Sequence, residues 1–152
     1  MSGLPAPNRH REIPQLHTTY PVILIDGGGR VTATARATVA VADVLLVLTL
    51  ASLPDARATQ RFFQEVVEEV APIKGWVSGA ILFTMVKTGT VLNVSGPGQI
   101  KDLGYPVLET PLSHRMTYQE AIAQGRSVGE YNARSQAAEA IQALFRELQE
   151  GL

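Results

Sequence analysis

The sequence contains no cysteine, which excludes disulfide bonds, thiolate metal sites and cysteine nucleophiles. It also lacks the phosphate-binding loop G-x-x-x-x-G-K-[ST], since none of its three lysines (Lys74, Lys87 and Lys101) follows a glycine-rich loop. No apolar run reaches the roughly 20 residues that span a bilayer. The N-terminus lacks the basic and then apolar pattern of a secretion signal, so we expect a cytoplasmic protein without membrane segments.

Charged residues are scarce and nearly balanced, at 18% of the chain with a formal net charge of −1. This balance gives no global reason to expect nucleic acid as a partner. The histidines lie far apart without a matching ligand cluster, which disfavours a zinc site, and no G-x-S-x-G elbow of a serine hydrolase is present. At 152 residues, 45% of them hydrophobic, the chain is long enough to bury a core of its own.

The pattern along the chain predicts a flexible lead-in over residues 1–19, which hold three prolines, and one α/β domain over residues 20–152. Apolar runs predict strands at Val22–Ile25, Val44–Leu50, Gly79–Val86 and Pro106–Glu109. The first three are nearly continuous Val, Ile and Leu, as in parallel strands buried on both faces. Helical patterns lie between and after them, at Thr32–Ala42, Pro54–Val70, Thr117–Gln124 and Ser135–Leu148. This alternation predicts a parallel sheet flanked by helices.

The last predicted helix is amphipathic. Its apolar stripe consists of Ile141, Leu144, Phe145 and Leu148, and its other face carries Glu139, Arg146, Glu147 and Glu150. An anionic membrane surface attracts Lys and Arg, whereas this polar face is net acidic. We therefore expect the stripe to pack on the sheet.

The run PVILIDGGGR, residues 21–30, is the strongest candidate for a functional site. A carboxylate at the end of a strand, here Asp26, can hold Mg²⁺. Gly27, Gly28 and Gly29 let the backbone approach a phosphate or turn sharply, and Arg30 can contact an anion. The alternative is a glycine-rich turn in which Asp26 only caps the next helix. Spacing alone leaves both interpretations open.

Several segments, taken in order, resemble the C-terminal half of ParA-type partition ATPases, the deviant Walker family that includes the MinD proteins. The segment 23–30 resembles the Walker B strand with its Gly-Gly-Arg turn, and 42–47 resembles the strand that follows. Residues 106–110 and the Arg115-x-x-Tyr118-x-Glu120-Ala121 pattern resemble a late strand and helix of the family. The resemblance implies a truncated P-loop NTPase fold without its P-loop strand.

The chain also departs from the family. Both lysines of the family's P-loop are absent, and Val31 stands where the family has an acidic residue. In the family's layout the P-loop strand lies between the Walker B strand and the strand corresponding to Val44–Leu50. Its loss leaves a gap in the sheet, and the backbone N–H and C=O groups on both sides of the gap lose their hydrogen-bond partners. Three arrangements would close this gap. The two flanking strands could pair directly, residues 1–20 could supply a strand, or another chain could do so.

The resemblance implies a ParA-like protein that acts in plasmid or chromosome partition, or in cargo positioning, through protein contacts and without ATP hydrolysis of its own. No cofactor is then expected for the chain alone. One alternative is a half that completes an ATPase in trans, where a partner's P-loop and Asp26 together bind Mg-ATP. Another is a small α/β regulatory module with a binding pocket at residues 26–30 lined by Ser113 and His114.

The partners implied are a ParB-like adaptor or a ParA-type ATPase, and a homo-oligomer, with no membrane. Ser113, His114 and Arg115 are predicted to face a nucleotide base or a partner protein. Arg115, Arg126 and Arg134 are candidate DNA contacts near the C-terminal helices; the alternative is that they are solvated or paired.

Overall fold

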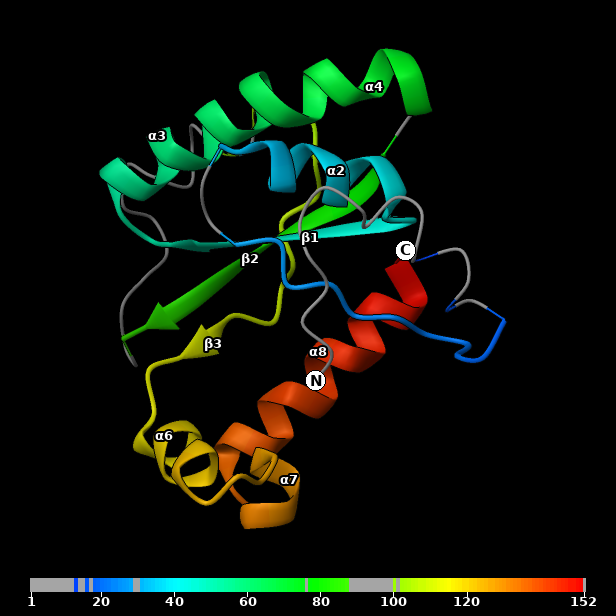
Figure 1. The fold of residues 1–152 in the computed structure, drawn as a ribbon. Helices are drawn as coiled ribbons and strands as arrows, with labels where there is room; N and C mark the ends of the chain where they lie inside the picture. Colours follow the sequence, from blue (N-terminus) through cyan, green and yellow to red (C-terminus); the bar gives the residue numbers. More distant parts are fainter. Residues whose placement is uncertain are drawn as a thin grey trace. The chain divides into compact units, whose positions relative to one another are not determined.

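The computed structural model has an α/β fold with a small three-stranded parallel sheet flanked by helices, as predicted (Figure 1). It describes residues 13, 16, 18–28, 31–75, 77–87, 100 and 102–151. The chain forms two compact units that alternate along the sequence. The first unit is Met1–Leu45 with Gln60–Ser78, and the second is Leu46–Thr59 with Gly79–Leu152. The flexible lead-in predicted over residues 1–19 falls mostly outside the described residues.

The sheet has the order β1-β2-β3. Strand β1 (Val44–Leu50) has the predicted bounds, and β2 (Ser78–Val86) begins one residue before its predicted start. Strand β3 (Leu112–Ser113) is short and pairs in parallel with β2. Most of β2 is buried, with Ile81 and Leu82 almost completely inaccessible. The central strand therefore carries the core of the second unit, as its continuous apolar sequence predicts.

The predicted strand Pro106–Glu109 is reduced to one isolated bridge, between Val107 and Ile81. The amide of Ile81 donates to the Pro106 carbonyl at 2.8 Å, and the Leu108 amide donates to the Ile81 carbonyl at 2.9 Å. The next two amides, of Glu109 and Thr110, donate instead to the carboxylate of Glu147. Because these amides leave the ladder, pairing with β2 resumes only at β3.

Two predictions of strands buried on both faces are wrong. Residues 22–25 adopt no strand, and Val22 and Leu24 are 74% and 94% exposed. Strand β1 does form, but Leu48 is 60% exposed and only Thr49 along the strand is buried. Burial on both faces requires a neighbour on each side. In the described part of the chain β1 lies at an edge of the sheet and no strand pairs with residues 22–25.

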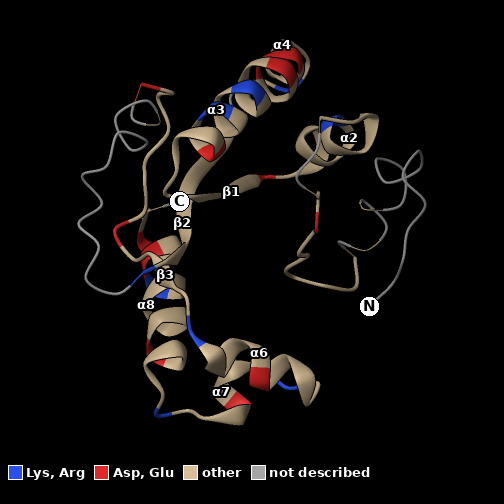
Figure 2. Cartoon of the chain, turned by 90° about the vertical axis from the view of Figure 1, so that its left-hand side faces the viewer, with Lys and Arg blue, Asp and Glu red and all other residues tan. Residues whose placement is uncertain are grey.

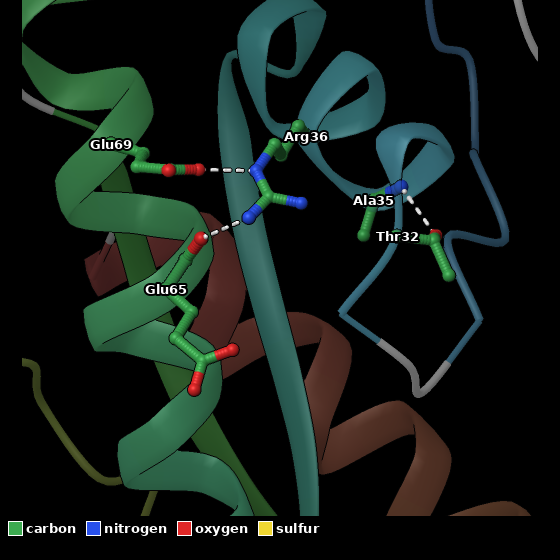
Figure 3. Close-up of polar contacts among 5 residues, drawn as sticks. All are labelled: Thr32, Ala35, Arg36, Glu65 and Glu69. Carbon is green, nitrogen blue, oxygen red and sulfur yellow. Dashed lines mark hydrogen bonds and ion pairs between the residues drawn. The ribbon is translucent and has the colours of Figure 1, made fainter.

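The first unit is built around α2 (Ala33–Val41), which was predicted over Thr32–Ala42. The Thr32 hydroxyl accepts a hydrogen bond from the Ala35 amide at 3.2 Å and so caps the helix, as Figure 3 shows. At the other end, the Lys74 ammonium donates to the carbonyls of Ala42 and Val39. A cation at this end also complements the helix dipole.

The predicted helix Pro54–Val70 is a longer helical stretch with a π turn inside it. It consists of α3 (Leu53–Phe62), the π segment η2 (Phe63–Val67) and α4 (Glu68–Lys74). Val66, Val67 and Val70 are buried as predicted, but Phe63 is buried in place of the more accessible Phe62. The wider π turn changes the angular spacing of side chains, which a 3.6-residue period does not anticipate.

Arg36 joins α2 to this stretch (Figure 3). Its guanidinium forms an ion pair with Glu69 and donates from Nη2 to the Glu65 carbonyl at 3.0 Å. The Glu65 carbonyl belongs to the π turn, whereas Glu69 belongs to α4. Arg36 therefore connects α2 to both the π turn and α4.

Replacing Arg36 with methionine is expected to lower the free energy of unfolding by about 0.5–1 kcal/mol, because both contacts are partly exposed to solvent. Lysine at this position should recover only part of the loss, since an ammonium lacks the planar arrangement of donors that reaches both acceptors. Urea denaturation measures the change. Arg57→Met, at an exposed arginine of α3, is the control and should leave the free energy of unfolding unchanged. An equal effect at both arginines would contradict a stabilising role for the contacts of Arg36.

The helices of the second unit follow β3. They are α6 (Met116–Ala123), α7 (Val128–Tyr131) and α8 (Gln136–Gly151). Helix α6 stops where predicted, because Gly125 has φ of +65° and the Arg126 amide donates back to the Ala121 carbonyl at 3.0 Å. Helix α7 was not predicted, although its capping box of Ser127 and Glu130 is visible in the sequence.

Helix α8 packs against β3 and α7. Its buried residues are Ala137, Ala138 and Leu144. The prediction that the whole apolar stripe packs on the sheet is wrong for Ile141 and Phe145, which are 38% and 60% exposed. At 100° per residue, Ile141 and Phe145 fall on the same side of the helix as the buried Ala137, Ala138 and Leu144, so the described chain covers this side of α8 only in part.

Candidate functional site at the ends of the strands

Asp26 lies in a tight turn. The Gly28 amide donates to its Oδ1 atom at 3.1 Å, and Gly28 has φ of +68°, a conformation that favours glycine. A Cβ atom on Gly27 would lie 3.4 Å from Thr38 Cγ2 of α2, which is an ordinary van der Waals contact. This geometry fits the turn interpretation, although the helix cap is Thr32 and not Asp26. Gly29 and Arg30 lie outside the described residues.

A magnesium ion at Asp26 stays a prediction. Within the described residues no group of three or more His, Asp or Glu side chains is placed to hold a metal ion. Asp26 is exposed, and one of its oxygens already accepts the Gly28 amide. Additional ligands for a cation would be waters, phosphate oxygens or groups outside the described residues.

Ser113, His114 and Arg115 mark the end of β3 and the start of α6. The His114 amide donates to the Val86 carbonyl at 3.0 Å and so extends the pairing of β2 and β3. Arg115 is the N-cap residue of α6 and makes no side-chain cap bond. Ser113 is half-buried and His114 is exposed. These residues belong to the second unit and Asp26 to the first, so a shared pocket stays a prediction.

Three threonines join the C-terminal ends of β1 and β2 to α3, which sequence reasoning missed. The Thr59 hydroxyl donates to the Thr49 hydroxyl at 2.9 Å, and the Thr84 hydroxyl donates to the Thr49 carbonyl at 3.4 Å. Thr49 and Thr59 are buried. Because the two buried hydroxyls bond to each other, this cluster satisfies buried polar groups and holds the strand ends together.

Met85 has a strained backbone at the end of β2. Its φ is +53°, the one positive value at a residue other than glycine in the described part of the chain. Thr84 pairs with Leu112 and Val86 pairs with Ser113, so Met85 is the extra residue of a β-bulge. Its side chain is 57% exposed. Such strain is frequent at functional sites. Here it falls at the carboxyl end of a strand, where open α/β sheets bind their ligands.

Glycine at position 85 should raise the free energy of unfolding by up to about 1 kcal/mol, because it removes the cost of a side chain at positive φ. Valine should lower it by about 1 kcal/mol, because a β-branched side chain tolerates this conformation least. Thermal and urea unfolding of the two variants measure these opposite changes in the free energy of unfolding. A bulge that is not strained would instead make glycine the more destabilising change.

The three arginines proposed as DNA contacts all lie in the helical part of the second unit. Arg115 is half-buried, and Arg126 and Arg134 are exposed. Hydrogen bonds from the Ser127 amide and hydroxyl lower the pKa of Glu130, and the charge of Arg126 contributes to the same shift. Figure 2 shows acidic residues on α6, α7 and α8 among the basic ones, without a continuous basic stretch. The DNA contacts stay a prediction.

Glu147 of α8 holds the segment between Val107 and β3. Its carboxylate accepts the Glu109 amide at 2.5 Å and the Thr110 amide at 3.0 Å. Burial opposes its ionisation, but the hydrogen bonds from Glu109 and Thr110 outweigh burial and lower the pKa of Glu147. The sequence pattern placed Glu147 only on a solvated face, and no local signal connects it to a segment almost 40 residues away in the chain.

No protein-family model matches the chain, and a search of curated proteins gives no match. Among the described helices, none combines the length and the apolar character needed to cross a membrane.

Proposed function

We propose that this chain is a ParA-like protein with a truncated P-loop fold that acts in DNA partition or cargo positioning through contacts with another protein. It carries out no ATP hydrolysis of its own, because phosphoryl transfer depends on a phosphate-binding loop and metal that position the nucleotide. Its partner is a ParA-type ATPase or a ParB-like adaptor. The order of the family-like segments in the sequence supports this proposal.

The exposed segment 22–25 is the observation that carries the proposal. Val22 and Leu24 are 74% and 94% exposed, whereas Ile23 and Ile25 are half-buried. One side of an extended, apolar segment therefore faces solvent, with alternating exposure as in a strand. Covering an apolar side chain of this size is worth about 1.5–3 kcal/mol. A segment that is strand-like in sequence and unpaired in the described chain is suited to pairing with a strand of a partner.

The test is binding of the purified chain to a ParA-type ATPase and to a ParB-like adaptor from the same cell, measured by fluorescence anisotropy. We expect Leu24→Asp to weaken binding at least tenfold, because it places a charge in the contact. Ile73→Asp is the matched control, since Ile73 is also an exposed apolar residue, at 89%, but lies on α4. Absence of binding to both proteins, or equal loss in both variants, would reject the proposal.

A second candidate function is the completion of an ATPase in trans, which the position of Asp26 directly after the exposed segment favours. A partner strand paired with residues 22–25 would place its own phosphate loop beside this carboxylate. Calorimetric titration with Mg-ATP separates the two candidates. Binding by the mixture of chain and partner that is lost in Asp26→Ala supports completion in trans. Binding that is unchanged by this substitution supports a protein contact alone.

A further inference from the structure

Helix α8 carries an apolar surface that the described chain does not cover. Ile141 and Phe145, one helical turn apart, are 38% and 60% exposed. Together with Gln142 and Arg146 they line a shallow hollow of about 420 Å³. Exposed aromatic and aliphatic side chains that line a hollow on one helix are typical of a contact surface, where Phe and Arg are enriched.

We propose that this surface binds the same surface of a second copy of the chain, with the two α8 helices antiparallel. The arrangement of charge selects this occupant. Arg146 is flanked along the helix by Glu139 and Glu150, and all three side chains are exposed. A parallel pair would set each of these groups at the level of its own like charge in the other copy, with no opposite charge at that level. An antiparallel pair with a two-fold axis near residue 143 brings each Arg146 to the level of the other copy's Glu139.

The register of the apolar pair agrees with that of the charges. If Ile141 lies opposite Phe145 of the other copy, the two-fold axis passes at the level of residue 143. If Arg146 lies opposite Glu139 of the other copy, the axis passes between residues 142 and 143. At 1.5 Å per residue the two positions differ by about 0.75 Å, well within the reach of an arginine side chain. At 100° per residue, Arg146 and Glu139 also lie on the same flank of the hollow. Like flanks face each other in an antiparallel pair.

The contact is small. Two turns of helix per copy bury less than the ~1,200 Å² at the low end of stable interfaces, so the dimer is expected to dissociate readily on dilution. Sedimentation velocity over a range of protein concentrations should therefore show a reversible shift from monomer to dimer. Phe145→Glu should abolish this shift. Ile122→Glu is the control, because Ile122 is 75% exposed on α6 and lies outside the contact.

Charge reversal provides the sharper test. Arg146→Glu and Glu139→Arg should each remove dimerisation, because each creates like charges across the axis. An equimolar mixture of these two variants should dimerise again, since every facing pair is then oppositely charged, and the double variant should dimerise alone. A chain that stays monomeric at all concentrations overturns the proposal. A dimer that is unaffected by Phe145→Glu, or variants that do not complement on mixing, would overturn it equally.

Discussion

Replacing Ile81 with alanine should destabilise the second unit by about 3–4 kcal/mol, the largest single effect that we expect from a side-chain truncation. Ile81 is 0% exposed and lies in the middle of β2, the central strand. Its backbone bonds to Pro106 and Leu108 remain after the change, so the loss measures side-chain packing. The cavity left behind adds to the lost transfer energy, because a rigid sheet collapses only partly. Urea denaturation measures the difference.

The informative control is Leu24→Ala. The sequence predicts Leu24 to be as deeply buried as Ile81, because both lie in continuous apolar runs. Leu24 is 94% exposed, so its truncation should change the free energy of unfolding by less than about 0.5 kcal/mol. A loss of several kcal/mol at Leu24 would mean that residues 22–25 are covered in the folded protein. It would also weaken the proposal that a partner binds there.

Removal of the Glu147 carboxylate is expected to have the second-largest effect. Glu147→Ala leaves two backbone amides without their acceptor and frees α8 from the segment before β3. Each charge-assisted hydrogen bond contributes about 1 kcal/mol in this half-exposed setting, so the total loss should be about 2 kcal/mol. Glu147→Gln should lose about half of that, because the amide keeps one acceptor oxygen. An alanine variant as stable as the parent would contradict this assignment.

The same contact predicts how stability depends on pH. The hydrogen bonds from Glu109 and Thr110 hold the pKa of Glu147 below its ordinary value in the folded state. The stabilisation is therefore fully present above the unfolded pKa of about 4.5, and it is lost as the pH falls through the folded pKa. Comparing unfolding curves of the parent and of Glu147→Gln from pH 6 to pH 3 should show the difference between them shrinking. Glu150→Gln, which neutralises an exposed acid of the same helix, is the matched control for the loss of one carboxylate charge.

Local sequence patterns predicted the elements whose boundaries are set within a few residues. Helix α2 begins at the Thr32 cap, α6 ends before Gly125, and β1 and β2 match their apolar runs. Capping groups, glycines at positive φ and apolar runs act over one turn or one strand, so the sequence alone contains the information. The Asp26 turn belongs to the same class, because its hydrogen bond spans only two residues.

The sequence by itself thus determined an α/β chain with a glycine-rich turn at Asp26 and without the loop that binds phosphate. Tertiary structure decided which apolar segments are covered: Ile81 is inaccessible, whereas Leu24 and Phe145 face solvent. It also decided where the strain and the long-range contacts lie, at the Met85 bulge and at the Glu147 carboxylate. The physical reason is that burial, ladder pairing and hydrogen bonds between distant residues depend on neighbours that local periodicity does not specify.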